Sequence, residues 1–344
     1  MAIFSPDLAI DLGTTNTLVY VVRRGIVISE PTVVVSETGN PQVIRAVGED
    51  AQYLLGRTND SLTVTRPIQS GVIASVDMTQ ALIQYFIRKA IGISHVFSKP
   101  RVLISVPCTL DEINRKALEE AARAAGARKT YLIEKPYAAA IGTGLPVFEP
   151  VGSMVVDVGG GTTDAAVVSL GGLVVCRSIP VGGDRMDEAI ANYLKRQAVI
   201  IGAATAESVK IDLGSAMPLA EQRKVRVRGR DAVTVSIAKD VDFTSAQCYE
   251  ALKEPCRSII NVIRWVLERT PPELAGDIMR NGIHLTGGGS QLFGLDHLIA
   301  TELGIPAMLA REPGDCTITG LGYLAENIQL LESIGRQRSV IGDQ

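Results

Sequence analysis

The stretch Met154–Asp164, MVVDVGGGTTD, predicts a buried strand that ends at Asp157 and is followed by a turn of three glycines. Because glycine has no side chain, backbone N–H groups in such a turn can approach phosphate oxygens closely. The carboxylate of Asp157 can hold a hydrated Mg²⁺ against the same phosphates, and Thr162 and Thr163 add hydroxyl donors. Glycine turns after strands are common, so this stretch alone fits either a phosphate site or an ordinary turn.

A second copy of the pattern lies near the N-terminus. The apolar segment Leu8–Ile10 leads to Asp11, which precedes Asp157 by 146 positions, and the loop Gly13–Asn16 follows. Each copy continues into a hairpin with a glycine at its turn. A repeat of this length indicates a duplicated half-domain rather than a solenoid, whose periods are roughly 20–50 residues. Two such loops facing each other would clamp one nucleotide, and a third glycine turn, LTGGGSQL, lies at Leu285–Leu292.

Composition sets wide limits on the class of protein. The chain has 344 residues, of which 46% are hydrophobic, enough for two domains or one large bilobed unit. The formal net charge of −3 gives no electrostatic case for nucleic-acid binding. Five cysteines without a CxxC pair, together with three histidines, show no zinc pattern and predict reduced thiols in a cytosol. No apolar run approaches the roughly 18–20 residues that a spanning helix needs.

Three local patterns carry predictions about individual elements. Thr109 and Glu112 have the spacing of a capping box at the start of a helix. The segment Val225–Val235 predicts two strands that turn near Gly229. A long helix is expected in the region that contains Pro255, which predicts a break or kink there.

Several stretches, in order along the chain, resemble the actin, sugar-kinase and heat-shock-chaperone superfamily. They include AIDLGTTNTLVY (Ala9–Tyr20), LIEKPYAAAIGTGLPV (Leu132–Val147) and IPVGGDRMDEAI (Ile179–Ile190). Within that superfamily the resemblance is to the MreB/Mbl family of bacterial actins, from about Asp7 to Leu331. It implies an α/β, actin-like fold with duplicated ribonuclease-H-like halves around a nucleotide cleft, in two lobes with four subdomains.

The resemblance also implies where these subdomains begin and end. Subdomain IA would comprise residues 1–32, 66–145 and the closing helix and tail 315–344; IB would comprise 33–65; IIA would comprise 146–182 and 244–314; and IIB would comprise 183–243.

By the same resemblance, ATP or ADP would bind between the lobes with Mg²⁺ held through waters by Asp11 and Asp157. The two phosphate loops would be Gly13, Thr14, Thr15, Asn16 and Gly159, Gly160, Gly161, Thr162. The ribose and adenosine would lie near Gly183, Asp184, Glu207, Lys210, Gly287, Gly288, Gly289 and Ser290. From the residues alone, Glu207 and Lys210 fit a surface ion pair better than a nucleotide site, because they lie one helical turn apart.

One position departs from the family pattern Leu-Ile-Glu-Glu-Pro, in which the second Glu helps to position the attacking water. Here Lys135 follows Glu134, and Asp164 also stands where the family usually has Glu. Beside a triphosphate a lysine stays charged, so it cannot take a proton from water. It can instead act as a point charge on the γ-phosphate or fill the space of a hydrated Mg²⁺. The catalytic candidates are Asp157, Thr162, Glu134 and Lys135. Because of Lys135 we expect intact ATP binding and slow or absent hydrolysis. The alternative is that Lys135 points to solvent and that Glu134 positions the attacking water instead.

The function that the resemblance implies is that of a cytoskeletal protein. It would polymerise with itself into membrane-associated filaments that direct cell shape and wall synthesis, in the cytoplasm at the inner face of the cell membrane. Its partners would be wall-synthesis or rod-complex membrane proteins, and no nucleic acid. Val96 and Phe97 would dip into the inner leaflet, with Lys99 and Arg101 near lipid headgroups; from the residues alone they fit a loop whose apolar side chains tuck inward. A small-molecule kinase or ATPase of the same superfamily is the alternative.

Overall fold

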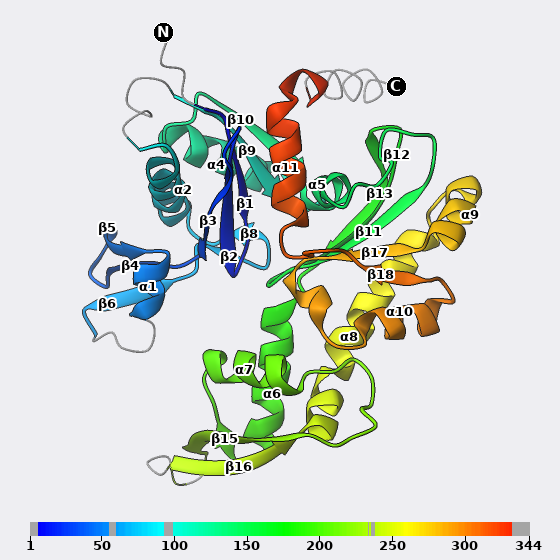
Figure 1. Ribbon diagram of the computed structural model, residues 1–344. Coiled ribbons are helices and arrows are strands. Elements are labelled where there is room, and N and C mark those ends of the chain that lie inside the picture. The colour runs from blue at the N-terminus through cyan, green and yellow to red at the C-terminus, as the bar shows by residue number, and fades with distance from the viewer. Residues whose placement is uncertain (1–5, 55–59, 93–98, 233, 235–237, 332–344) are drawn as a thin grey trace.

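The computed structural model describes residues 6–54, 60–92, 99–232, 234 and 238–331. It has two lobes, each built around a five-stranded sheet, and Figure 1 shows them side by side. The strands of the first sheet are β1 (Leu8–Leu12), β2 (Asn16–Val21), β3 (Gly25–Pro31), β9 (Arg101–Val106) and β10 (Lys129–Glu134). Those of the second are β11 (Ser153–Val158), β12 (Thr163–Ser169), β13 (Gly172–Ile179), β17 (Ile283–Thr286) and β18 (Ala307–Leu309).

The two sheets have the same topology, which confirms the predicted duplication. Their orders are β10-β9-β1-β2-β3 and β18-β17-β11-β12-β13, and in each the first strand of the hairpin pairs with an antiparallel neighbour on one side and a parallel one on the other. Even the loops correspond. The N–H of Gly13 donates to the carbonyl of Asn16 at 3.1 Å, and that of Gly159 donates to Thr162 at 2.8 Å.

Two helices, α5 (Lys135–Gly142) and α11 (Cys316–Glu326), lie between the two sheets (Figure 1). They share an apolar core with residues from both sheets, among them Ala9 and Val155. They also cross very closely, because a methyl group on Gly320 would overlap the carbonyl of Ala138. The lobes are therefore joined by a tightly packed helix pair as well as by the chain.

The other helices cover the outer faces of the sheets or belong to smaller units. On the first lobe are α2 (Val76–Ile91) and α4 (Glu112–Ala124), and on the second are α8 (Ser245–Leu267), α9 (Pro272–Asn281), α10 (Leu295–Leu303) and the 3-10 turn η1 (Gly288–Gln291). Helix α4 begins with Asp111 as its N-cap, whose side chain accepts from the N–H of Asn114, so the capping box predicted at Thr109 is wrong. Among the described helices, none has the length and apolar composition to cross a membrane.

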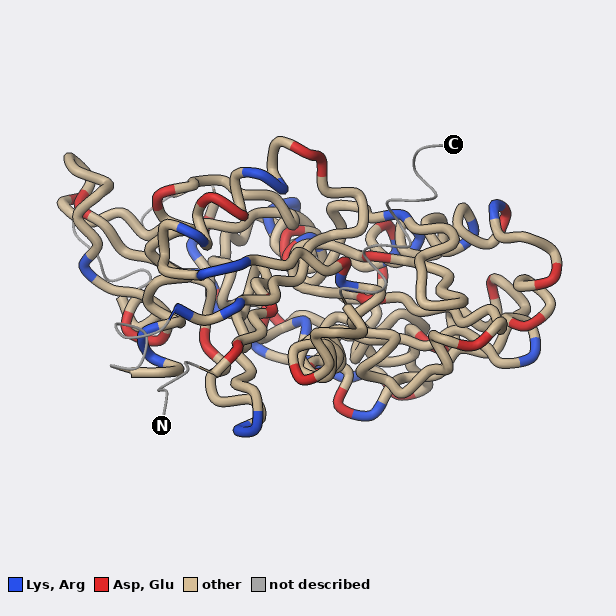
Figure 2. The backbone as a smooth tube through the Cα atoms, turned by 90° about the horizontal axis from the view of Figure 1, so that it is seen from above, with Lys and Arg blue, Asp and Glu red and all other residues tan. Residues whose placement is uncertain are grey.

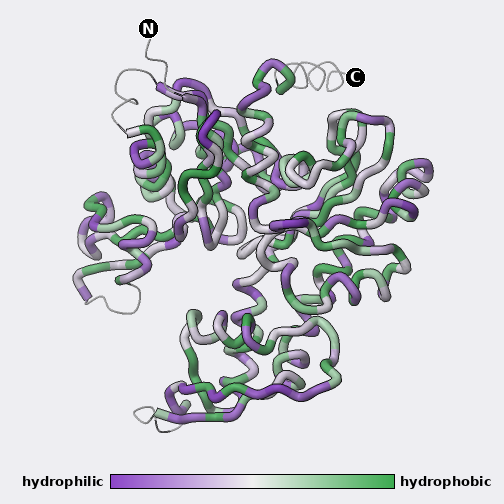
Figure 3. Tube along the Cα trace, viewed as in Figure 1, coloured by the Kyte–Doolittle hydropathy of each residue, from purple (hydrophilic) through white to green (hydrophobic). Residues whose placement is uncertain are grey.

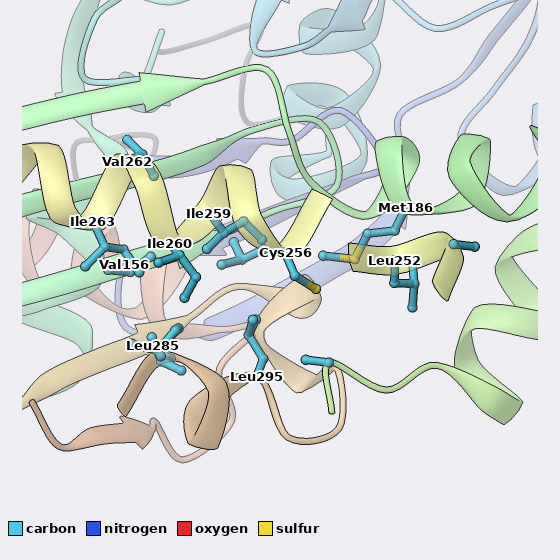
Figure 4. Packing of buried hydrophobic residues seen from close by; sticks show 14 of the residues in the cluster. Val156, Met186, Leu252, Cys256, Ile259, Ile260, Val262, Ile263, Leu285 and Leu295 are labelled. Carbon is cyan, nitrogen blue, oxygen red and sulfur yellow. The ribbon is translucent and has the colours of Figure 1, made fainter. Parts of the chain in front are cut away.

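Helix α8 runs without interruption through Pro255, so the predicted break there is wrong. Figure 4 shows why the helix persists: side chains on both sides of the proline, including Leu252 and Ile259, face the core of the second lobe. In Figure 4, Leu252 lies beside Met186, whereas Ile259 lies toward Val156 of β11 and Leu285 of β17, and all five side chains are buried. Burial of this continuous face outweighs the loss of one backbone hydrogen bond at the proline.

A smaller unit extends from each lobe. The first has α1 (Glu49–Tyr53) and a sheet of β4 (Val34–Glu37), β5 (Asn40–Val47) and β6 (Leu62–Thr65), and the short pair β7 (Ile68–Gln69) and β8 (Val72–Ile73) leads back from it. The second has α6 (Gly183–Arg196), α7 (Ala203–Leu213) and a sheet of β14 (Val199–Ile200), β15 (Lys224–Asp231) and β16 (Ala238–Thr244). Gly229 lies inside β15, so the turn predicted near it is wrong.

Charge and hydropathy follow this architecture. Figure 3 shows hydrophobic residues along the central strands of both lobes, whereas β15 and β16 are mainly hydrophilic. Cross-strand ion pairs hold these two strands together, for example between Arg228 and Asp240 at 2.9 Å. In Figure 2 the basic and acidic residues are interspersed, without a large region of one sign.

Candidate functional site

A cavity of about 900 Å³ lies between the two lobes. Residues from both halves line it, and most of those expected at a nucleotide site are among them: Asp11, Gly13, Thr14, Thr15, Asn16, Lys135, Asp157, Gly159, Gly160, Gly161, Thr162, Gly183, Asp184, Glu207, Lys210, Gly287, Gly288 and Gly289. Two predicted residues lie elsewhere. Ser290 is buried beneath the glycine turn, where its hydroxyl donates to the carbonyl of Gly287 at 2.6 Å. Glu134 is not among the described residues that line the cavity.

The two glycine loops touch each other at the bottom of the cavity. A methyl group on Gly160 would overlap the hydroxyl of Thr15, and one on Gly161 would overlap the hydroxyl of Thr14. Glycine is therefore required here by contact between the loops, not only by approach to a ligand. Gly287 has a φ of 81°, a conformation that favours glycine, and a side chain there would overlap the backbone of Val158.

Hydroxyl groups from neighbouring parallel strands orient the two aspartates that end the central strands. Ser105 of β9 donates to Asp11, and Thr286 of β17 donates to Asp157 at 2.9 Å. These two hydroxyls occupy matching places in the two halves. Neither hydroxyl was predicted from the sequence, although each lies near the end of a mainly apolar strand.

Lys135 lies in a cluster with three carboxylates. Its Nζ atom is 3.5 Å from Asp11 Oδ1, and its residue is only 9% exposed. Asp157 is 5% exposed, and Asp164 is fully buried, accepting from the N–H of Cys108 and the hydroxyl of Thr162 at 3.0 Å each. The alternative in which Lys135 points to solvent is therefore wrong.

The charges in this cluster depend on one another. Burial alone favours the neutral amine of Lys135, but the charges of Asp11, Asp157 and Asp164 outweigh it and raise the pKa of the lysine. Burial raises the pKa of Asp157 to about 6, although the ammonium acts in the opposite direction. Burial also raises the pKa of Asp164. Lys135 therefore keeps its positive charge across the physiological pH range.

Glu134 faces away from this cluster, although it is adjacent in sequence. Its carboxylate accepts from the guanidinium of Arg115 at 3.2 Å. It is thus engaged in an ion pair with helix α4, and the cavity wall at this point presents the ammonium of Lys135 instead of a carboxylate. The interpretation of Glu134 as the residue that serves in catalysis does not agree with this placement.

The cluster is a poor fit for the Mg²⁺ ion expected at Asp11 and Asp157. Within the part of the chain that the structure describes, no three His, Cys, Asp or Glu side chains are arranged to hold a metal ion. The cation close to Asp11 is the ammonium of Lys135. An ion placed between the two aspartates would have to share Asp11 with a fixed positive charge, so the chemistry proposed below does not depend on a metal ion.

At the other end of the cavity, Lys210 does not form the surface pair with Glu207 that the spacing allowed. Its Nζ atom is 2.9 Å from a carboxylate oxygen of Asp187 in α6, and it also donates to the carbonyl of Gly183 at 3.2 Å. Asp187 was not predicted, although it lies one turn after Asp184 on the same helix. Asp184 itself pairs with Arg66 of the first lobe at 3.3 Å, which links the two lobes.

Comparison with known proteins agrees with this geometry. The family model described as MreB/Mbl protein matches residues 5–333. The chain is 46% identical over 331 residues to the cell shape-determining protein MreB of Escherichia coli strain K12, covering 95% of each. It is 43% identical over 329 residues to the cell shape-determining protein Mbl of Bacillus subtilis strain 168, covering 95% of this chain and 98% of Mbl.

Solved structures show the same fold. MreB5 of Spiroplasma citri bound to AMPPNP has a TM-score of 0.89 and 33% identity, covering 96% of this chain and 98% of the other, and its ADP complex has a TM-score of 0.88 and 32% identity, with 95% and 99% covered. The MamK double helical filament, at 22% identity and a TM-score of 0.76, covers 93% of this chain and 99% of MamK and shares the fold. The chain, with its duplicated sheets around one cavity, belongs to the MreB/Mbl family, and its fold is actin-like.

Proposed function

We propose that this protein is an ATP-binding, actin-like cytoskeletal protein that polymerises into membrane-associated filaments directing cell shape and wall synthesis. The observation that carries the nucleotide part is the cavity between the two glycine loops, which opens between the lobes and is lined by residues from both halves. The similar MreB5 structures bound to ADP and AMPPNP support it.

The proposed pose follows from the lining of the cavity. Phosphates lie against the backbone N–H groups of Gly13–Asn16 and Gly159–Thr162, close to the N-terminus of α5, where the helix dipole favours negative charge. The adenosine lies toward Glu207 and the Gly287–Gly289 turn. A thermal-shift or calorimetric titration with AMPPNP tests this pose: saturable binding with one nucleotide per chain supports it, and no binding would reject it.

We further propose that bound ATP is hydrolysed slowly or not at all. Lys135 stands at the cavity wall with a raised pKa, so it has no lone pair to accept a proton from the attacking water. Glu134 is held by Arg115. Phosphate release from polymerising protein tests the idea. We expect higher turnover in Lys135→Glu, and wild-type turnover that is substantial and disappears in Lys135→Ala would contradict it.

Assembly and membrane attachment remain proposals that rest on family membership. With ATP we expect filaments that sediment and are visible by electron microscopy, and a protein that stays monomeric with nucleotide and lipid would contradict this. The expected membrane residues Val96 and Phe97 lie outside the described residues. Nearby, Arg101 pairs with Asp7 at 3.0 Å, so it is less free for headgroups than the sequence suggested.

Co-sedimentation with anionic vesicles tests the membrane contact, and Phe97→Ser should release the protein from them while leaving nucleotide binding unchanged. A localisation at the inner face of the cell membrane, and partners among wall-synthesis or rod-complex membrane proteins, follow only if this binding is found. Cross-linking of intact cells followed by identification of the captured proteins tests the partners directly.

A further inference from the structure

The nucleotide cavity contains a cation that belongs to the chain itself. The Lys135 side chain is 11% exposed and reaches the cavity wall that Asp11 and Asp157 also form. The backbone of Lys135 is fixed by the elements before and after it. Strand β10 ends at Glu134, α5 begins at Lys135, and Pro136 follows within the first turn of the helix. The ammonium is therefore held in place by the backbone and by its carboxylates.

The charges explain what this ammonium can do. Asp11, Asp157 and Asp164 with Lys135 give the cluster a net charge of −2 when all are ionised. A glutamate at position 135, as in the family pattern, would make that charge −4. The exchange of a carboxylate for an ammonium adds two positive charges, the same as one bound divalent cation. A nucleoside triphosphate is strongly negative. In this chain the ammonium of Lys135 supplies, next to its phosphates, the positive charge that a bound divalent cation would otherwise supply.

The geometry points in the same direction. The metal-binding interpretation places a hydrated ion against Asp11 and Asp157, but Asp11 lies 3.5 Å from the ammonium of Lys135, so such an ion would meet a fixed positive charge. Asp157 accepts from Thr286 and interacts electrostatically with the same ammonium. In the described part of the chain no other set of acidic, His or Cys side chains offers a replacement site.

We propose that the Lys135 ammonium takes the place of the divalent cation in this site, so that the protein binds a nucleoside triphosphate without Mg²⁺. This inference rests on the proposed nucleotide binding and adds which form of the nucleotide is the ligand. The metal-free triphosphate binds with its phosphates against the two glycine loops and its β- and γ-phosphate charge facing Lys135. The protein then has no need of a metal ion to hold ATP and lacks the group that would activate water.

The test is calorimetric titration of the full-length protein with AMPPNP in millimolar Mg²⁺ and in excess EDTA. For the wild type we expect dissociation constants that differ by less than about threefold, whereas Lys135→Glu should lose about tenfold or more in EDTA and recover in Mg²⁺. Lys116→Glu is the matched control, because it makes the same charge change at an exposed side chain of α4 and should leave both constants unchanged.

Two results would overturn the inference, and they are distinguishable. Wild-type binding in Mg²⁺ that disappears in EDTA rejects the inference alone, whereas no binding in either solution rejects nucleotide binding itself. If Lys135→Glu does not fold, Lys135→Gln removes the charge without adding a fourth carboxylate, and its binding should weaken in EDTA and recover in Mg²⁺. A second readout is Mn²⁺ bound per AMPPNP by electron paramagnetic resonance: far below one in the wild type and near one in Lys135→Glu.

Discussion

Replacing Lys135 with methionine keeps most of the length and apolar volume of the side chain but removes its ammonium group. The three carboxylates around it are 8%, 5% and 0% exposed, so water from the cavity can replace the charge of the lysine only in part. At 3.5 Å and an effective dielectric constant of about 20, the attraction between Lys135 and Asp11 alone is about 5 kcal/mol. Removing one partner of such a buried pair typically costs about 3–5 kcal/mol of stability.

Protonation of Asp157 limits this loss, and it makes the loss depend on pH. The pKa of Asp157 is about 6 because of burial, and it rises further once the ammonium is absent. Holding a proton on Asp157 at pH 7.5 costs at most about 2 kcal/mol, and at pH 5.5 it costs almost nothing. We therefore expect Lys135→Met to lose about 2–4 kcal/mol at pH 7.5 and about 1 kcal/mol at pH 5.5.

These losses can be measured as melting temperatures of the nucleotide-free protein. A chain of 344 residues has an unfolding entropy of about 0.7 kcal/mol per kelvin. The expected decreases are thus about 3–6 °C at pH 7.5 and about 1–2 °C at pH 5.5. Lys116→Met, at a side chain that is 70% exposed, is the control and should change little at either pH.

A decrease of less than about 1 °C at pH 7.5, or an equal decrease at both pH values, would refute the reasoning. The double variant Asp11→Asn/Lys135→Met gives an independent check. Because it removes both members of the pair, it should recover part of the stability lost in Lys135→Met. No recovery would mean that the lysine acts through packing instead of charge.

Three further changes test other parts of the site. Asp157→Asn should raise the melting temperature at pH 7.5 and flatten its pH dependence between about pH 4 and 6. The reason is that the pKa of Asp157 in the folded protein, about 6, exceeds its unfolded value, so the ionised carboxylate destabilises the fold at higher pH. An unchanged profile in a pH series of melting curves would contradict this. Gly160→Ala should weaken AMPPNP binding about tenfold or more in calorimetric titration, because its methyl overlaps Thr15 and separates the two loops. Gly320→Ala should lower stability by about 1–3 kcal/mol in calorimetric melting, because its methyl overlaps a carbonyl of α5, whereas Gly276→Ala, which has open space, serves as the control.

The duplication could be predicted because each copy of the pattern consists of residues that are close together in the sequence. A strand, an aspartate, a glycine turn and a hairpin recur at a spacing of 146, and each part depends on residues within a few positions of one another. The structure adds that each loop contains the same internal hydrogen bond, from the N–H of Gly13 to the carbonyl of Asn16 in one and from the N–H of Gly159 to the carbonyl of Thr162 in the other.

Elements that depend on tertiary packing could not be predicted in the same way. Gly229 indicated a turn, but it lies in β15, where glycine is required because a side chain would collide with the backbone of Ile200 in the neighbouring strand β14. Pro255 indicated a break, but burial of the surrounding helix face keeps α8 continuous. The partner of Lys210 is Asp187, which lies 23 positions away on another helix, so no local spacing rule identifies it.

The placement of Lys135 explains how one substitution can alter chemistry without altering the fold. In the proposed pose, contacts to the phosphates come mainly from backbone N–H groups of the two loops and from the start of α5, and these depend on glycine geometry that Lys135 does not affect. Proton transfer and charge balance, in contrast, depend on the single side chain at position 135. The duplicated loops are therefore consistent with nucleotide binding whatever residue stands there, and in our proposals that residue decides whether the nucleotide turns over and whether it needs a metal ion.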